Sequence, residues 1–167
     1  ATPNFHHINV LGDALGAGKP ILCEKPLCTN LDDTQEVMQH VARHNLIFQV
    51  GMEYRFKPAL ADMIARIDGG DIGTLHMLSI REHRFPFLPK VADWNRFNAN
   101  TGGTLVEKCC HFFDLMRRMV GSEPVGVMAS AGQSVNHLDE LYDGHTPDIW
   151  DNAYVVFEFQ NGARAML

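Results

Sequence analysis

The amino-acid sequence predicts an α/β segment followed by an α+β domain with a large, mainly antiparallel sheet. In the first third, two short apolar runs alternate with two helical patterns, which is typical of parallel strands with crossover helices. From about residue 74 the pattern changes to longer extended segments, which favour antiparallel strands. A globular fold agrees with the composition, because 46% of the 167 residues are hydrophobic and 20% are charged.

The α/β segment has short links between its elements. The expected order is a helix at residues 6–15, a strand at 20–23, a helix at 30–45 and a strand at 46–50. The first helix is expected to stop at Gly16 and Gly18, which end helices readily. Asn30 is the expected N-cap of the second helix, and His44 with Asn45 is expected to end it.

The α+β domain is expected to cover residues 54–167, after a first domain of residues 1–53. It should contain a helix at residues 58–67 and strands at 74–85, 125–135 and 152–159. Between them, Gly102 and Gly103 allow a tight turn before a half-buried helix that reaches Met116 and beyond. Asn161 and Gly162 predict a two-residue hairpin turn into a return strand that the chain does not finish, so this domain is expected to be truncated.

Charge and composition argue against several classes of partner. A net charge of -6 and a pI near 5.8 give no electrostatic reason to bind a nucleic acid or an anionic membrane. No apolar run approaches the roughly 20 residues that span a bilayer, and the first residues lack the pattern of a signal peptide. The four cysteines are interpreted as reduced thiols, so we expect a cytoplasmic protein.

Two groups of residues are candidates for proton chemistry. Glu107, His111 and Asp114 are spaced four and three residues apart, so on one helix they would form a stripe of acid, imidazole and acid. The plainer interpretation is a set of surface ion pairs. Lys25 follows an apolar strand, where ligands bind in open α/β sheets, and could donate a hydrogen bond to a substrate hydroxyl. Its plainer interpretation is a surface pair with Glu24.

Histidine and cysteine pairs raise the question of a metal site. His40 and His44 lie one helical turn apart, but no third ligand type is near them in the sequence. Cys109 and Cys110 are adjacent to His111, yet neighbouring residues point in different directions on a helix. We therefore expect no metal site.

Four motifs occur in a fixed order along the chain. They are Ala1-Thr2-Pro3-Asn4 with His7, the run 17–27 (AGKPILCEKPL), Val50-Gly51 with Arg55-Phe56 and Pro58, and the stretch 101–116. Their order and spacing resemble the Gfo/Idh/MocA family of NAD(P)-dependent oxidoreductases, over essentially the whole chain. The resemblance implies the end of a Rossmann domain followed by much of a substrate domain. The earlier Rossmann strands and their glycine fingerprint would lie upstream of Ala1.

The resemblance also implies roles for individual residues. Lys25 is similar to the catalytic lysine of the family, and His111 to its active-site histidine. Glu107 stands where many members have aspartate, and would orient the imidazole. Positions that resemble cofactor-binding or cleft-lining ones are Thr2, Pro3, Glu24, Lys25, Arg55 and Trp94.

These roles imply a dehydrogenase or reductase that uses NAD or NADP and acts on a sugar, polyol or related hydroxyl or carbonyl compound. A hydroxyl proton would pass to His111 or Lys25 while hydride passes to the nicotinamide. A homo-oligomer through the sheet face is expected. Two alternatives stay open: a non-catalytic interaction module, because the chain lacks the glycine fingerprint, and a metal hydrolase built on Glu107, His111 and Asp114.

Overall fold

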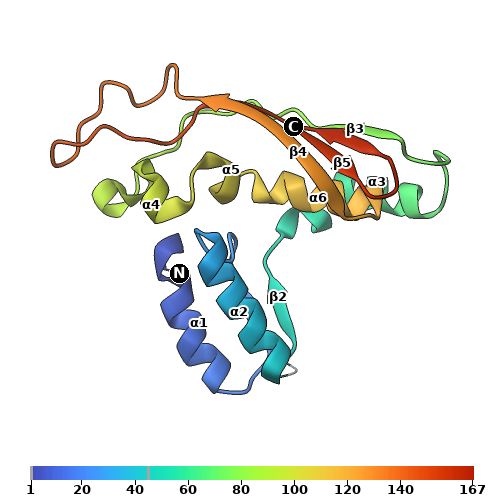
Figure 1. The fold of residues 1–167 in the computed structure, drawn as a ribbon, viewed down its shortest axis with the longest axis horizontal. Helices are drawn as coiled ribbons and strands as arrows, with labels where there is room; N and C mark the ends of the chain where they lie inside the picture. Colours follow the sequence, from blue (N-terminus) through green and yellow to red (C-terminus); the bar gives the residue numbers. More distant parts are fainter. Residues whose placement is uncertain (1, 45) are drawn as a thin grey trace. The chain divides into compact units, whose positions relative to one another are not determined.

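The computed structural model describes residues 2–44 and 46–167, and Ala1 and Asn45 lie outside the described residues (Figure 1). Contacts divide the chain into two compact units. The first unit contains Ala1–Gly51, Phe87–Cys110 and His137–Ile149, and the second contains Met52–Pro86, His111–Asn136 and Trp150–Leu167. The first break falls close to the domain boundary expected after residue 53. Two later segments nevertheless make their contacts in the first unit.

The first unit begins with the predicted α/β segment. Helices α1 (His7–Gly16) and α2 (Leu31–His44) accompany strands β1 (Ile21–Cys23) and β2 (Phe48–Val50), which pair in parallel. The two helices and the strands share a core of four buried side chains: Leu11, Cys23, Cys28 and Val37. The expected cap of α2 is confirmed, because the backbone N–H of Asp33 donates to Asn30 Oδ1 at 2.8 Å. Asn45, expected with His44 to end this helix, is not among the described residues.

Short helices complete the first unit. They are η1 (Asn4–His6), η3 (Val91–Arg96), α4 (Asn98–Thr101) and α5 (Thr104–Glu107). The prediction of one continuous helix through the 101–116 stretch is wrong, since α5 ends at Glu107 and α6 (Cys110–Val120) begins three residues later. The expected glycine turn is present. Gly102 and Gly103 both have left-handed backbone angles, with φ of 76° and 82°.

The glycine turn predicts opposite outcomes for two glycine-to-alanine substitutions. A Cβ on Gly102 would lie 2.6 Å from the carbonyl oxygen of Thr29, on a backbone with φ of +76°. Gly102→Ala is therefore expected to lower the free energy of unfolding by about 1–3 kcal/mol. Gly12, within α1, has no atom within 4 Å of such a Cβ. Gly12→Ala is expected to raise the free energy of unfolding by about 0.5–1 kcal/mol. Urea unfolding of both variants measures the two changes. Equal effects would contradict the turn geometry.

The second unit confirms the predicted α+β architecture. Its sheet has the order β3-β6-β5-β4, built from β3 (Met77–Ser79), β4 (Pro124–Gly132), β5 (Asn152–Phe159) and β6 (Arg164–Met166). β4, β5 and β6 pair antiparallel, and β3 pairs with β6 in parallel. A tight turn that contains Asn161 and Gly162 joins β5 to β6, so the hairpin is confirmed, but the turn is longer than the predicted two residues because the Phe159 N–H donates to the Ala163 carbonyl. The first strand, expected at residues 74–85, is only three residues long.

Helices cover one face of this sheet. Figure 1 shows α6 along the sheet, and η2 (Glu53–Phe56) and α3 (Pro58–Asp68) belong to the same unit. Met116 and Val120 of α6 pack against Phe159 and Ala165 of the sheet. Leu115 and Met119, on another face of α6, pack against Ile64 of α3. α6 is thus the central helix of the second unit.

Candidate functional site

Lys25 lies just after the carboxyl end of β1, in the first unit. Its Nζ donates a hydrogen bond to the backbone carbonyl of Glu107 at 2.8 Å. The neighbouring end of β2 is packed closely, because the Gly51 N–H donates to the Cys23 carbonyl at 2.7 Å. A Cβ on Gly51 would meet Glu24 Oε2 at 3.4 Å. The half-buried Lys25 ammonium is therefore held by one backbone acceptor and keeps two N–H groups for other acceptors.

Glu107 joins Lys25 to a second lysine. The Glu107 side chain is buried, and its Oε1 lies 3.3 Å from Lys90 Nζ. Lys90 Nζ also lies 4.5 Å from the centroid of the Trp94 ring, a cation–π contact. We call Lys25, Glu107, Lys90 and Trp94 the lysine cluster. It combines one buried carboxylate with two ammonium groups, an arrangement that suits recognition of a polar or electron-rich ligand.

The first motif of the chain lies against the second. His7 Nδ1 is 2.9 Å from the carbonyl oxygen of Pro26, beside Lys25. The carbonyl of Pro3 accepts the backbone N–H of His6 at 3.0 Å and so starts η1. Thr2, the residue before it, is exposed. The predicted positions Thr2 and Pro3 therefore belong to a segment that is anchored to the Lys25 loop through His7.

His111 is held in the second unit by residues that the sequence did not single out. Its ring is buried and stacks on Tyr54, with centroids 4.1 Å apart and planes 6° from parallel. His111 Nε2 lies 3.4 Å from Glu53 Oε1. Lys57 Nζ lies 3.3 Å from the Tyr54 centroid, and because the imidazole covers one face, the ammonium covers the other. Tyr54 is thus fixed between a cation and the imidazole.

Glu107 and His111 do not lie on one helix, as the sequence had predicted. Glu107 ends α5 in the first unit, whereas His111 lies in α6 and in the second unit. The carboxylate near His111 Nε2 is that of Glu53, and the side-chain partner of Glu107 is Lys90. Glu53 and Tyr54 adjoin the Arg55 motif, which is the one sequence signal that could have found them. Lys90 carried none.

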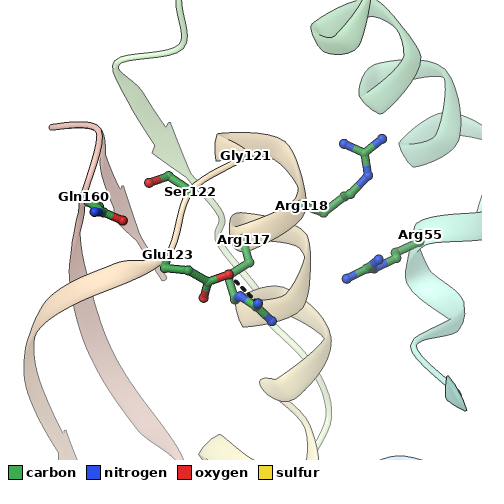
Figure 2. Close-up of a pocket in the computed structure, with 7 residues that line it drawn as sticks. All are labelled: Arg55, Arg117, Arg118, Gly121, Ser122, Glu123 and Gln160. Carbon is green, nitrogen blue, oxygen red and sulfur yellow. Dashed lines mark hydrogen bonds and ion pairs between the residues drawn. The ribbon is translucent and has the colours of Figure 1, made fainter. Parts of the chain in front are cut away.

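Arg55 and Asp114 bind each other in the second unit. Arg55 donates two hydrogen bonds to the Asp114 carboxylate, at 2.6 and 2.5 Å. Arg55 also lines a pocket of about 400 Å³ with Arg117 and Arg118. Figure 2 shows Arg117 pointing to Glu123.

Each arginine of this pocket already has a carboxylate. Arg117 pairs with Glu123 at 2.5 Å, and Arg118 makes two hydrogen bonds to Asp68 of α3. Because the charges are matched, the pocket is better explained as an ion-pair network around α6 than as an anion site.

Neither a cluster of possible metal ligands nor a helix that could span a membrane occurs among the described residues. In that part of the chain, no group of three or more His, Cys, Asp or Glu side chains is arranged to hold a metal ion. His40 and His44 lie with ring centroids 6.4 Å apart. Within the same residues, no helix is long and apolar enough to cross a membrane.

A buried ion pair holds the segment that carries Trp94. Arg96, with 2% of its side chain exposed, donates to Glu140 Oε2 at 2.6 Å and to the Phe87 carbonyl at 2.9 Å. His137 Nδ1 and the Tyr142 hydroxyl also contact the Glu140 carboxylate, at 2.7 and 2.8 Å. Burial by itself would raise the pKa of Glu140, but these three hydrogen bonds lower that pKa to about 2.

This lowered pKa predicts acid sensitivity. A carboxylate with a depressed pKa in the folded state stabilises the fold fully above its unfolded pKa, near 4.3, and loses that contribution as the pH falls towards about 2. Glu140→Gln is expected to be less stable than the unsubstituted protein at about pH 5, with the difference shrinking towards about pH 2.5. Urea unfolding across this range measures it. A difference independent of pH would contradict the assignment, and Glu158→Gln, at an exposed ion pair, is the control.

Two parts of the chain match known protein domain families. Residues 1–52 match the NAD-binding Rossmann fold of an oxidoreductase family, and residues 64–167 match the C-terminal alpha/beta domain of an oxidoreductase family. The two matches follow the order of elements described above.

Individual relatives agree with these matches. The uncharacterized oxidoreductase YrbE of Bacillus subtilis (strain 168) is 34% identical over 99% of this chain and 46% of its own length. The scyllo-inositol 2-dehydrogenase (NAD(+)) of the same organism is 31% identical over 97% of the chain and 44% of its own. The structure of levoglucosan dehydrogenase in complex with NADH superposes with a TM-score of 0.81 at 26% identity, covering 99% of this chain and 45% of that one.

The chain thus spans slightly less than half the length of these relatives. They are described as oxidoreductases and dehydrogenases, which gives no support to the alternative of a non-catalytic interaction module.

Proposed function

Because the chain belongs to the Gfo/Idh/MocA family of oxidoreductases, we propose that it is part of an NAD- or NADP-dependent dehydrogenase of a sugar, polyol or related hydroxyl or carbonyl compound. The observation that carries the proposal is the half-buried Lys25 ammonium, held at the carboxyl end of a parallel strand by the Glu107 carbonyl. Relatives described as inositol dehydrogenases support the substrate class. In the experiments below, the full-length protein is this chain together with any further residues that correspond to the greater length of its relatives.

The residues present fit a nicotinamide cofactor. Ligands of open α/β sheets bind beyond the carboxyl ends of the strands, where Lys25 and Glu24 lie. Gly51, at the end of the neighbouring strand, lets the backbone there approach closely. When bound, the nicotinamide supplies the site that accepts or donates hydride.

The side chains of this chain would then handle the hydroxyl proton. Lys25 would donate its remaining N–H groups to the substrate oxygen and hold it in place. The His111 imidazole would take the proton, since histidine is the side chain most often used as a general base. Glu53 would stabilise the charged imidazole through Nε2, and stacking on Tyr54 would fix the ring plane. In this proposal Glu107 acts chiefly by positioning Lys25 and Lys90.

Steady-state kinetics of the full-length protein test this function. With NAD or NADP and inositols or aldoses as substrates, we expect turnover that falls about 10²-fold or more in His111→Ala. His83→Ala, at an exposed histidine of the same unit, is the control. Turnover that survives His111→Ala within about tenfold would overturn the proposed role of the imidazole.

We propose that the open face of the sheet pairs with a second copy of the protein. The face opposite the helices carries exposed apolar side chains, with Met77, Met128 and Tyr154 exposed by 78%, 64% and 72%. Such a patch on one face favours association. Sedimentation of the full-length protein with Met128→Glu tests the interface, and an unchanged oligomeric state would contradict it. None of the four cysteines forms a disulfide, and on this basis we propose a cytoplasmic location.

A further inference from the structure

A pocket of about 540 Å³ lies in the first unit, and none of its lining residues is among those assigned to proton chemistry. Residues of the Trp94–Asn100 region line one part of it, and residues of the Tyr142–Asp148 loop line the other. Its volume is within the roughly 300–1,000 Å³ of small-molecule sites. Both segments belong to the same unit, and the buried Arg96–Glu140 pair ties them together.

Three aromatic side chains form the apolar part of the pocket. Phe97 and Tyr142 meet edge to face, with ring centroids 6.1 Å apart and planes at 83°. Trp94 contacts Lys90 and lies 6.2 Å from the Phe5 ring, in an edge-to-face arrangement. These contacts fix the rings before any ligand arrives. Aromatic faces of this kind pack well against the C–H face of a sugar ring.

The polar side chains of the pocket divide into two groups. Asp148 is committed to structure, since its carboxylate accepts the backbone N–H of Asn98 at 2.6 Å. The side chains of Asp143, His145 and Thr146 make no hydrogen bond or ion pair with another described residue. The backbones of Tyr142 and His145 exchange two hydrogen bonds of 2.9 Å. This tight turn presents hydroxyl, imidazole and carboxylate groups that can bind sugar hydroxyls.

The charge of the pocket disfavours an anionic ligand. Of the described residues that line it, none is lysine or arginine, whereas two are aspartates, Asp143 and Asp148. A phosphate or carboxylate in this position would be repelled by the two aspartates and would find no cation to pair with. With an anion disfavoured, the aromatic rings together with the hydroxyl, imidazole and carboxylate groups of the turn fit a polyhydroxylated ring.

Trp94 connects this pocket to the lysine cluster, because the same ring lines the pocket and contacts Lys90, which pairs with Glu107. We propose that the pocket binds a second sugar ring of the substrate, attached to the ring that reacts near Lys25. This proposal rests on the proposed function and adds to it a preference for disaccharides or glycosides over single-ring polyols.

Calorimetric titration of the full-length protein with D-glucose, maltose and cellobiose tests the proposal. We expect at least one disaccharide to bind about tenfold more tightly than glucose, because the second ring adds stacking and hydrogen bonds. Asp143→Asn and Thr146→Val keep the shape of each side chain and remove a charge or a hydroxyl. Each is expected to reduce the disaccharide preference about three- to tenfold. Asp139→Asn, at an exposed position outside the pocket, is the matched control and should leave the preference unchanged.

The outcomes separate this proposal from the proposed function. Equal affinity for glucose and both disaccharides would overturn the second-ring site, even if single-ring polyols are oxidised. A preference that Asp143→Asn and Thr146→Val leave intact would overturn it as well. A preference that both variants reduce, in a protein that oxidises none of the sugars or polyols offered, would support the pocket and overturn the dehydrogenase assignment.

Discussion

Replacing Lys25 with methionine is expected to lower kcat/KM of the full-length protein by about 10²–10⁴-fold. Methionine keeps the unbranched, flexible shape of the side chain but lacks the ammonium that donates to the Glu107 carbonyl at 2.8 Å. The substrate oxygen would lose both its hydrogen-bond donor and the nearby positive charge. Steady-state kinetics over a range of pH measure the loss. Lys25→Arg should not restore full activity, because a planar guanidinium cannot reproduce the geometry of a compact ammonium.

Lys19→Met supplies the control for this loss. Lys19 is exposed and lies in the same unit as Lys25. It precedes β1, the strand that Lys25 follows. Its side chain makes no hydrogen bond or ion pair with another described residue. Its substitution should therefore change kcat/KM by less than about twofold. If Lys25→Met retains activity within about tenfold of the unsubstituted protein, Lys25 is not catalytic.

Arg96→Met is expected to lower the free energy of unfolding by about 3 kcal/mol, the largest effect on stability that we predict. Arg96 is almost completely buried, and methionine would leave the Glu140 carboxylate without its cation and the Phe87 carbonyl without its donor. An uncompensated buried group costs more than the ion pair contributes when intact. Urea unfolding near neutral pH measures the difference.

The matched control for this prediction is Arg66→Met. Arg66 pairs with Asp62 on the surface of α3, where their side chains are 62% and 64% exposed. Solvent screens such a pair, so we expect a change below about 0.5 kcal/mol. Arg96→Met should also reduce the pH dependence assigned to Glu140, since it removes one of the three groups that lower its pKa. Equal costs for the two arginine variants would contradict the role given to burial.

Local signals in the sequence predicted most of the secondary structure. The cap at Asn30, the Asn161-Gly162 turn and the alternation of residues 152–159 depend on neighbouring residues alone, and the structure has all three. The continuous helix after Gly103 was wrong because helical spacing of apolar residues persists across the break near Lys108. Periodicity reports which residues are buried, and does not report whether the backbone is continuous.

The contacts around the site were harder to predict, because they join residues far apart in the sequence. Lys25 and Glu107 are 82 residues apart, yet one hydrogen bond joins them. Glu53 contacts His111, and Lys90 contacts Glu107, through pairings that no local pattern encodes. The resemblance to a family identified Lys25 and His111 as candidates. Side-chain partners such as Tyr54, which stacks on His111, required the structure.

The division of the chain into two units has a consequence for folding. The polypeptide passes from one unit to the other at residues 51–52, 86–87, 110–111, 136–137 and 149–150. Helices α1 and α2 belong to the first 51 residues of the first unit, but this unit also includes residues as late as Ile149. The Arg96–Glu140 pair and the Tyr142–Asp148 loop therefore form late during synthesis, after most of the second unit has been made. The lysine cluster needs residues only as far as Glu107, whereas the aromatic pocket cannot be complete until the chain has been made as far as Asp148.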